Sequence, residues 1–221
     1  MPKRTFLRRN LNFYVQKVVT GPFQENSYII WDSSNRQAIL IDPGDDCKLI
    51  NDQIKLNNLT PIAIINTHAH LDHIGAVSDL KNLYDIPFYL HKNEMMILDS
   101  YEDSCEMFGI SPNNKPSVNY WIKNEDKLSI GTFEIKIIHT PGHTPGGVCY
   151  EIEDHVFVGD TLFNGSVGRT DLPGGSWNTL KKSLMHLIDT VDHEKIIHSG
   201  HGNDTTLSFE LHSNSYLISL N

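Results

Sequence analysis

The sequence lacks the features that would place the protein in a membrane or in a disulfide-rich secreted class. No apolar run approaches the about 18 residues that a membrane-spanning helix needs, so we expect no membrane partner. Cysteine is scarce. The three present, Cys47, Cys105 and Cys149, are odd in number and widely spaced, which indicates neither a disulfide framework nor a CxxC zinc site. We therefore expect reduced thiols and a cytoplasmic location.

Basic residues are also fewer than acidic residues. With 18 Lys and Arg against 27 Asp and Glu, the net charge of −9 argues against general binding to nucleic acid. The basic residues are concentrated at the start, because residues 1–24 carry five of them and no acid. We expect residues 1–11 to be a solvated basic extension, with a short organellar presequence as the alternative. Residues 12–221 have the length of one folded domain.

Apolar and β-branched runs bounded by turn residues predict a chain rich in strands. The predicted strands are 13–19, 27–31, 37–41, 62–65, 87–90, 127–130, 133–138, 148–152, 155–158 and 194–197. Helices are predicted at 47–57, 75–84, 92–98 and 207–217, and from the capping Ser176 to about Ile188. Residues 101–118 are polar and contain proline, so we predict a surface excursion or lid there.

The segment 67–73 (THAHLDH) carries the strongest chemical signal in the chain. Four potential metal ligands, His68, His70, Asp72 and His73, directly follow the apolar run 62–65. Open α/β sheets place their chemistry at the C-terminal ends of such buried strands. Zinc and similar ions bind neutral imidazole and carboxylate groups. This crowding of ligands has little structural use, so it predicts a metal site.

Three more potential ligands each follow a different strand: His143 in PGHTPGG, Asp160 in GD and His201 in SGHG. Seven ligands are too many for one tetrahedral ion and suit two adjacent ions that share a carboxylate. The assignment is His68, His70 and His143 for one ion, Asp72, His73 and His201 for the other, and Asp160 as the bridge. We expect two divalent ions, with zinc favoured and iron or manganese also compatible.

Such a pair of ions, about 3.5–4 Å apart, binds a hydroxide between them and lowers the pKa of water toward about 7. The hydroxide would attack a carbonyl carbon, and a metal would stabilise the oxyanion. Asp72 would also orient the attacking hydroxide as a catalytic residue. This chemistry requires no serine or cysteine nucleophile, so we assign no catalytic role to Ser199 or Cys149.

Taken together, these motifs resemble the metallo-β-lactamase superfamily over about residues 12–221, which implies an α/β fold built as a four-layer αββα sandwich with the metals at one edge. Asp160 stands where the commonest zinc β-lactamases carry cysteine, and His70 stands where flavodiiron proteins carry glutamate. The chain is most similar to the glyoxalase II-like branch, the hydroxyacylglutathione hydrolases. Residues 168–175 (GRTDLPGG) and the tail 200–217 resemble the short bacterial type II glyoxalases.

This resemblance implies a metal-dependent hydrolase that cleaves a thioester such as S-D-lactoylglutathione to D-lactate and glutathione. Full-length glyoxalase II carries a C-terminal helical domain that helps bind glutathione, whereas this chain ends about one helix after His201. Short members of the branch share that feature and are assigned the same activity.

Two alternatives remain. Persulfide dioxygenases share the GRTD stretch and hold a single iron through residues that match His68, His143 and Asp160. Nucleases of the superfamily typically carry an inserted domain or long arm, and this chain has neither that length nor a basic stripe.

Two charged residues near the ligand segments have alternative roles. The planar guanidinium of Arg169 suits a substrate carboxylate, but it could equally pair with Asp171, or with the neighbourhood of Asp160, and brace its loop. Asp42 follows a strand and precedes Pro43-Gly44, so it either orients a ligand histidine or forms the turn.

Four side chains outside the ligand segments have a sequence context that gives only weak evidence of a functional role. Tyr101, Met107 and Phe108 either line the substrate cleft or cover the core under a long loop, and we favour the second role. His91 follows a strand without a partner motif, so we expect it to be structural.

Overall fold

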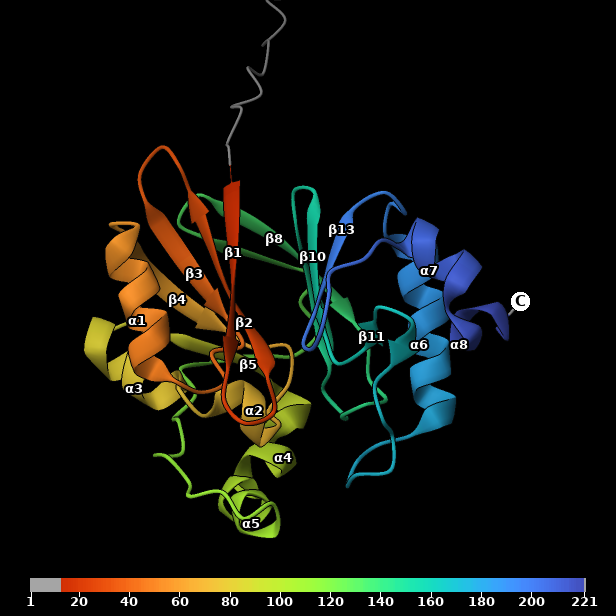
Figure 1. The fold of residues 1–221 in the computed structure, drawn as a ribbon, viewed down its shortest axis with the longest axis horizontal. Helices are drawn as coiled ribbons and strands as arrows, with labels where there is room; N and C mark the ends of the chain where they lie inside the picture. The colour runs from red at the N-terminus through yellow and green to blue at the C-terminus, as the bar shows by residue number, and fades with distance from the viewer. Residues whose placement is uncertain (1–12, 221) are drawn as a thin grey trace, which may run out of the picture.

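The computed structural model describes residues 13–220, so the predicted extension 1–11 and residue 12 lie outside the described chain. Two mixed sheets pack face to face, with helices on both outer faces (Figure 1). This is the αββα sandwich that the sequence implied. Within residues 13–220, no helix is both long and apolar enough to cross a membrane.

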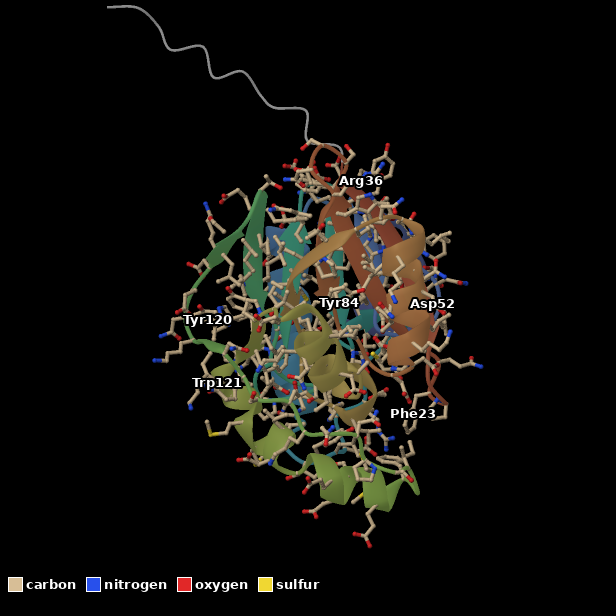
Figure 2. All side chains as sticks on the ribbon, turned by 90° about the vertical axis from the view of Figure 1, so that its left-hand side faces the viewer. Phe23, Arg36, Asp52, Tyr84, Tyr120 and Trp121 are labelled. Atoms are coloured by element: carbon tan, nitrogen blue, oxygen red, sulfur yellow. The ribbon has the colours of Figure 1, made fainter. Side chains whose placement is uncertain are left out.

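The first sheet comes from the N-terminal half of the chain. Its strands, in spatial order, are β1 (Phe13–Thr20), β2 (Glu25–Asp32), β3 (Gln37–Ile41), β4 (Thr60–Ile65), β5 (Phe88–His91) and β6 (Tyr120–Ile122). From β3 onward the neighbours run parallel, while β1, β2 and β3 form antiparallel pairs. The edge strand β6 was missed by the sequence prediction. It is only three residues long, and Tyr120 and Trp121 lie along the margin of the sheet (Figure 2).

The second sheet comes from the C-terminal half. Its strands, in spatial order, are β13 (Ile196–Ser199), β10 (His155–Gly159), β9 (Val148–Ile152), β8 (Phe133–His139) and β7 (Lys127–Ile130). A small hairpin, β11 (Leu162–Phe163) and β12 (Ser166–Val167), follows β10. Strand β10 runs parallel to β13 and antiparallel to β9.

The helices lie outside the sheets. They are α1 (Cys47–Leu56), α2 (Leu71–Ile74), α3 (Val77–Tyr84), the 3₁₀ turn η1 (Lys92–Glu94), α4 (Met95–Asp99), α5 (Tyr101–Met107), α6 (Trp177–Thr190), α7 (Leu207–Ser213) and α8 (Ser215–Ile218). In Figure 1, α1 and α3 cover the first sheet, and α6 covers the second.

Alternation along the strands builds a core on each face of the first sheet. In β3, Ile39 and Ile41 face the second sheet, while Leu40 packs toward α1 and α3. Because both faces are covered, the central strands β3 and β4 are apolar at nearly every position. Helix α6 covers the other sheet through Leu180 and Leu184, and the Ser176 side chain caps it by accepting a hydrogen bond from the Thr179 amide.

Two predicted elements differ in the structure. The predicted excursion 101–118 begins with helix α5, where Tyr101 and Cys105, four residues apart, are buried. The predicted single helix 207–217 is divided at Asn214, which ends α7 and caps α8 by accepting a hydrogen bond from the Tyr216 amide. A side chain that caps a new helix competes with continuation of the previous one.

Candidate metal centre

All seven predicted ligands meet at one end of the sandwich, because each follows a strand that ends there. The loop after β4 carries His68 and His70, and α2 carries Asp72 and His73. The loop between β8 and β9 carries His143, while Asp160 follows β10 and His201 follows β13. The fold therefore brings together segments that are up to 133 residues apart, from position 68 to position 201.

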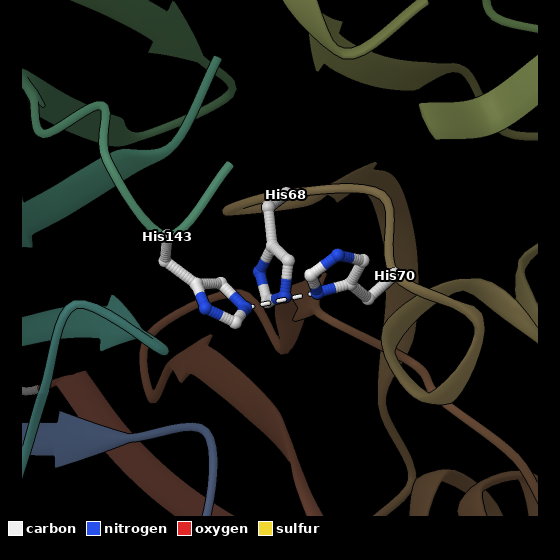
Figure 3. Close-up of side chains that lie close together, drawn as sticks. All are labelled: His68, His70 and His143. Carbon is white, nitrogen blue, oxygen red and sulfur yellow. Dashed lines mark hydrogen bonds between the residues drawn. The ribbon is translucent and has the colours of Figure 1, made fainter. Parts of the chain in front are cut away.

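The first group comprises His68, His70 and His143, whose candidate ligand atoms all lie within 4.8 Å of one another. The three imidazoles point toward a common centre, and His70 Nδ1 lies 2.9 Å from His143 Nε2 (Figure 3). Burial lowers the pKa of His68 well below its ordinary value and that of His70 to about 3. Both rings are therefore neutral at pH 7, which is the form that binds metal ions.

The second group comprises Asp72, His73 and His201, within the same distance of one another. His201 Nε2 lies 3.2 Å from Asp72 Oδ2. Burial raises the pKa of Asp72, but His73 and a hydrogen bond from His201 outweigh it and hold that pKa below its ordinary value. The carboxyl group is therefore ionised at neutral pH.

Asp160 lies between the two groups. Its oxygens are 3.3 Å from His73 Nε2, 3.5 Å from His143 Nε2 and 3.7 Å from His201 Nε2. Burial raises the pKa of Asp160, but electrostatic attraction to the adjacent His73 outweighs it and holds that pKa well below its ordinary value. An ionised carboxylate thus contacts both histidine sets, as a bridging ligand requires.

Several polar atoms of this cluster fit a bound cation better than a closed protein interior. Among residues 13–220, His68 Nε2 is buried with no hydrogen-bond partner. His73 Nε2 and Asp160 Oδ1 approach each other but lack hydrogen-bond geometry, and both are also buried. An unsatisfied buried polar atom costs about 1–3 kcal/mol. Imidazole nitrogens and carboxylate oxygens converging on one centre match the donors that zinc, iron and manganese prefer.

Asp42 orients two of these histidines. Its carboxylate accepts hydrogen bonds from the Thr67 amide at 2.7 Å and the Thr67 hydroxyl at 2.6 Å, and it lies 3.1 Å from His73 Nδ1. The Thr67 hydroxyl in turn lies 3.0 Å from His68 Nδ1. Of the two alternatives for Asp42, the structure therefore favours the orienting role. Such contacts fix the ring orientation and leave Nε2 for a metal.

We expect Asp42→Asn to weaken metal affinity by about 10- to 100-fold, the usual effect of removing such an outer contact. The amide nitrogen cannot accept the hydrogen bond that one carboxylate oxygen now receives. Competition with a chromophoric chelator measures this affinity. Asp85→Asn is the matched control, because Asp85 is exposed and shares the left-handed backbone of Asp42, with φ of 51° against 48°. Equal affinities in the two variants would contradict this role.

Arg169 orients the candidate ligand His143 through its backbone carbonyl, a role that the sequence did not predict. His143 Nδ1 lies 2.7 Å from the Arg169 carbonyl oxygen, so the ring donates there and leaves Nε2 facing the cluster. The guanidinium forms two 2.7 Å hydrogen bonds to Asp171, as one of the two alternatives proposed. Contact between Arg169 and substrate stays a prediction.

Glu94 was not identified from the sequence. It is fully buried, and its two carboxylate oxygens accept hydrogen bonds from the Ala69 amide at 2.9 Å and the Gly146 amide at 2.6 Å. Ala69 lies between two ligand histidines, and Gly146 lies three residues after His143. A single side chain thus joins the two loops that carry the first ligand group. An isolated glutamate at a helix start gives no sequence signal for this role.

A cavity of about 490 Å³ opens onto the cluster. Its walls include the ligands His70, Asp72, His143, Asp160 and His201. Tyr101, Met107 and Phe108 also line it, so the favoured prediction that these three only cover the core was wrong. Tyr101 belongs to both the core and the cavity, whereas Met107 and Phe108 are exposed.

Comparison with known protein families finds a match over residues 20–201 to the family described as the metallo-beta-lactamase superfamily. The chain is 40% identical over 206 residues to the "Probable metallo-hydrolase YqgX" of Bacillus subtilis, covering 91% of this chain and 96% of that protein. It is 34% identical over 209 residues to "Hydroxyacylglutathione hydrolase GloC" of Haemophilus influenzae, covering 93% and 98%.

Solved structures give the same match. The chain superposes on the BLEG-1 B3 metallo-beta-lactamase with a TM-score of 0.87 and 38% identity, covering 92% of this chain and 99% of that one. It superposes on the di-iron-bound form of TTHA1623 with a TM-score of 0.83 and 36% identity, covering 91% and 100%.

Proposed function

The chain is a metallo-hydrolase of the metallo-β-lactamase superfamily, and we propose that it cleaves thioesters, with S-D-lactoylglutathione as the reference substrate. The observation that carries this proposal is the pair of ligand groups joined by Asp160. The similarity to a hydroxyacylglutathione hydrolase over 93% of the chain supports it. We propose two divalent ions, preferably zinc, held by His68, His70 and His143 and by Asp72, His73 and His201, with Asp160 shared.

Bound there, the ions would supply a charge that polarises a carbonyl and lowers the pKa of water toward about 7. Asp72 lines the cavity as an ionised carboxylate, so it accepts a hydrogen bond from the attacking water and orients it. The Arg169 carbonyl holds His143 in place through Nδ1. A thiol has a pKa of about 8.5, so a thiolate leaves near neutral pH without a protein acid. A thioester therefore suits these residues better than an amide.

The second candidate is the persulfide dioxygenase suggested by the GRTD stretch. It is favoured by one observation: Asp160 lies 3.5 Å from His143 and belongs to the same cluster as His68, so a single iron would have its ligands. Asp72 and His201 would then hold no metal, although with His73 they offer three ligand atoms within 4.8 Å of one another. We therefore rank this function second.

Metal content and oxygen dependence, measured together, separate the two functions. We expect protein reconstituted with zinc, iron or manganese to bind two ions per chain. It should release glutathione from S-D-lactoylglutathione equally fast in air and under anaerobic conditions. One iron per chain, no thioester cleavage and oxygen uptake with glutathione persulfide would replace the hydrolase with the dioxygenase.

A further inference from the structure

The cavity beside the metal centre extends past the candidate ligands into an apolar region. We call this region the apolar arm, and its lining includes Phe23, Met96, Met107, Phe108 and Phe163. One wall comes from the first half of the chain, where Phe23 packs edge-on against Phe108 with ring centroids 5.6 Å apart. In Figure 2, Phe23 lies toward the helical end of the molecule that carries α5. Other lining residues come from the second half and include Phe163, whose ring lies edge-on to the candidate ligand His201, with ring centroids 5.9 Å apart. The arm is therefore continuous with the reaction centre.

Large apolar side chains around this arm are exposed to solvent. Met96 is 52% exposed, Met107 73% and Phe108 43%. Exposed apolar groups gathered around one opening typically mark a binding surface. Methionine suits such a surface because its flexible thioether adapts to differently shaped apolar ligands.

The charges of the arm fit a glutathione moiety poorly. Apart from the ligand histidines, Arg169 is the one basic side chain among the described residues that line the cavity. Its guanidinium is already engaged by Asp171 through two hydrogen bonds. Glutathione carries two carboxylates, and burying an unpaired carboxylate against apolar walls is costly. An apolar group has no charge to desolvate, and its transfer from water into the arm is favourable.

We propose that this arm selects thioesters that carry a bulky apolar acyl group, which it binds while the scissile carbonyl lies at the metal centre. The thioester chemistry rests on the proposed function, whereas binding of the apolar group rests on the cavity alone. A cavity of about 490 Å³ has room for such a group, since small-molecule sites span about 300–1,000 Å³. Discrimination between acyl groups arises because the arm stabilises the apolar group both in the enzyme–substrate complex and in the transition state.

The first test compares S-phenylacetylglutathione with S-D-lactoylglutathione, which differ only in the acyl group. We expect kcat/KM to be at least about tenfold higher for the phenylacetyl compound, since one methylene in an apolar pocket already changes it by about tenfold or more. Met96→Gln and Met107→Gln should each reduce this ratio. Leu56→Gln is the matched control, because Leu56 is 74% exposed and lies on α1, outside the cavity lining. A ratio near one, or one that Met107→Gln does not change, overturns the proposal.

The second test does not depend on turnover. Calorimetry with 3-phenylpropan-1-ol, an uncharged probe, should show saturable binding to the metal-loaded protein that weakens in Met107→Gln but not in Leu56→Gln. Binding without cleavage of either thioester would remove the proposed function and leave the apolar site in place. Cleavage without probe binding and without acyl preference would remove the apolar site and leave the proposed function in place. A dimer that dissociates in Met107→Gln while probe affinity is unchanged would assign this surface to a second copy of the chain and overturn the proposal.

Discussion

Asp160→Asn is expected to lower thioester hydrolysis by more than about 100-fold and to reduce metal content below two ions per chain. Removing an outer contact of a metal ligand typically costs about 10- to 100-fold, so loss of a ligand that contacts both groups should cost more. Asp160 is the residue whose oxygens approach His73, His143 and His201 together.

The change also removes a charge that the cluster depends on. The ionised Asp160 carboxylate would offset the positive charge that the two proposed cations would bring into a buried site, and an amide could not. The amide nitrogen would in addition present hydrogens to ring nitrogens that need their lone pairs for metal. Elemental analysis after dialysis and steady-state kinetics measure the two effects.

Asp189→Asn serves as the control for this experiment, because Asp189 is an exposed aspartate on α6. It should retain the metal content and rate of the parent. Retention of both ions and the parent rate in Asp160→Asn would rule out a shared carboxylate. The two groups would then have to act as independent sites.

The clustering of the seven candidate ligands could be predicted from sequence because its signals are local. His68, His70, Asp72 and His73 lie within six residues, directly after an apolar run that predicts a buried strand and forms part of β4. Ile39, Leu40 and Ile41 likewise form a continuous apolar run, which indicates a strand that is buried on both faces. Strand ends and turn residues then place the remaining ligands at the same end of the fold.

Features assembled from distant segments were not predictable in this way. Helix α5 buries Tyr101 and Cys105 in a mostly polar segment, so its hydrophobic periodicity is weak. The cavity takes Phe23 from one half of the chain and Phe163 from the other, and no local pattern joins them. Glu94 belongs to the same category, because its two partners lie 25 and 52 residues away.

Glu94→Gln is expected to destabilise the fold by about 2 kcal/mol and to lower kcat by about 10- to 100-fold. Glutamine is nearly the same size, but it has one acceptor oxygen where the carboxylate has two. Either the Ala69 or the Gly146 amide would then face an NH₂ group instead of an acceptor, in a fully buried position. At this chain length, about 2 kcal/mol corresponds to a fall in Tm of about 4–8 °C.

The effect on kcat follows from where the two amides lie. Ala69 stands between His68 and His70, and Gly146 belongs to the loop of His143, so Glu94 fixes the spacing of the first ligand group. A small displacement of one loop moves His143 relative to His70, whose nitrogens are 2.9 Å apart. Displacements of about 1 Å can cost about 100-fold in rate even when the altered residue lies away from the chemistry.

Three measurements distinguish a positioning role for Glu94 from a purely structural one. Melting temperature, metal affinity and kcat at saturating substrate should all fall in Glu94→Gln and stay at parent values in Glu194→Gln, an exposed glutamate at the other end of the chain. A lower Tm with unchanged metal affinity and kcat would make Glu94 a structural residue only. Glu94→Asp retains both acceptor oxygens on a shorter side chain, so it should recover part of the metal affinity that Glu94→Gln loses. That partial recovery would arise only if the carboxylate holds the two loops at a set distance.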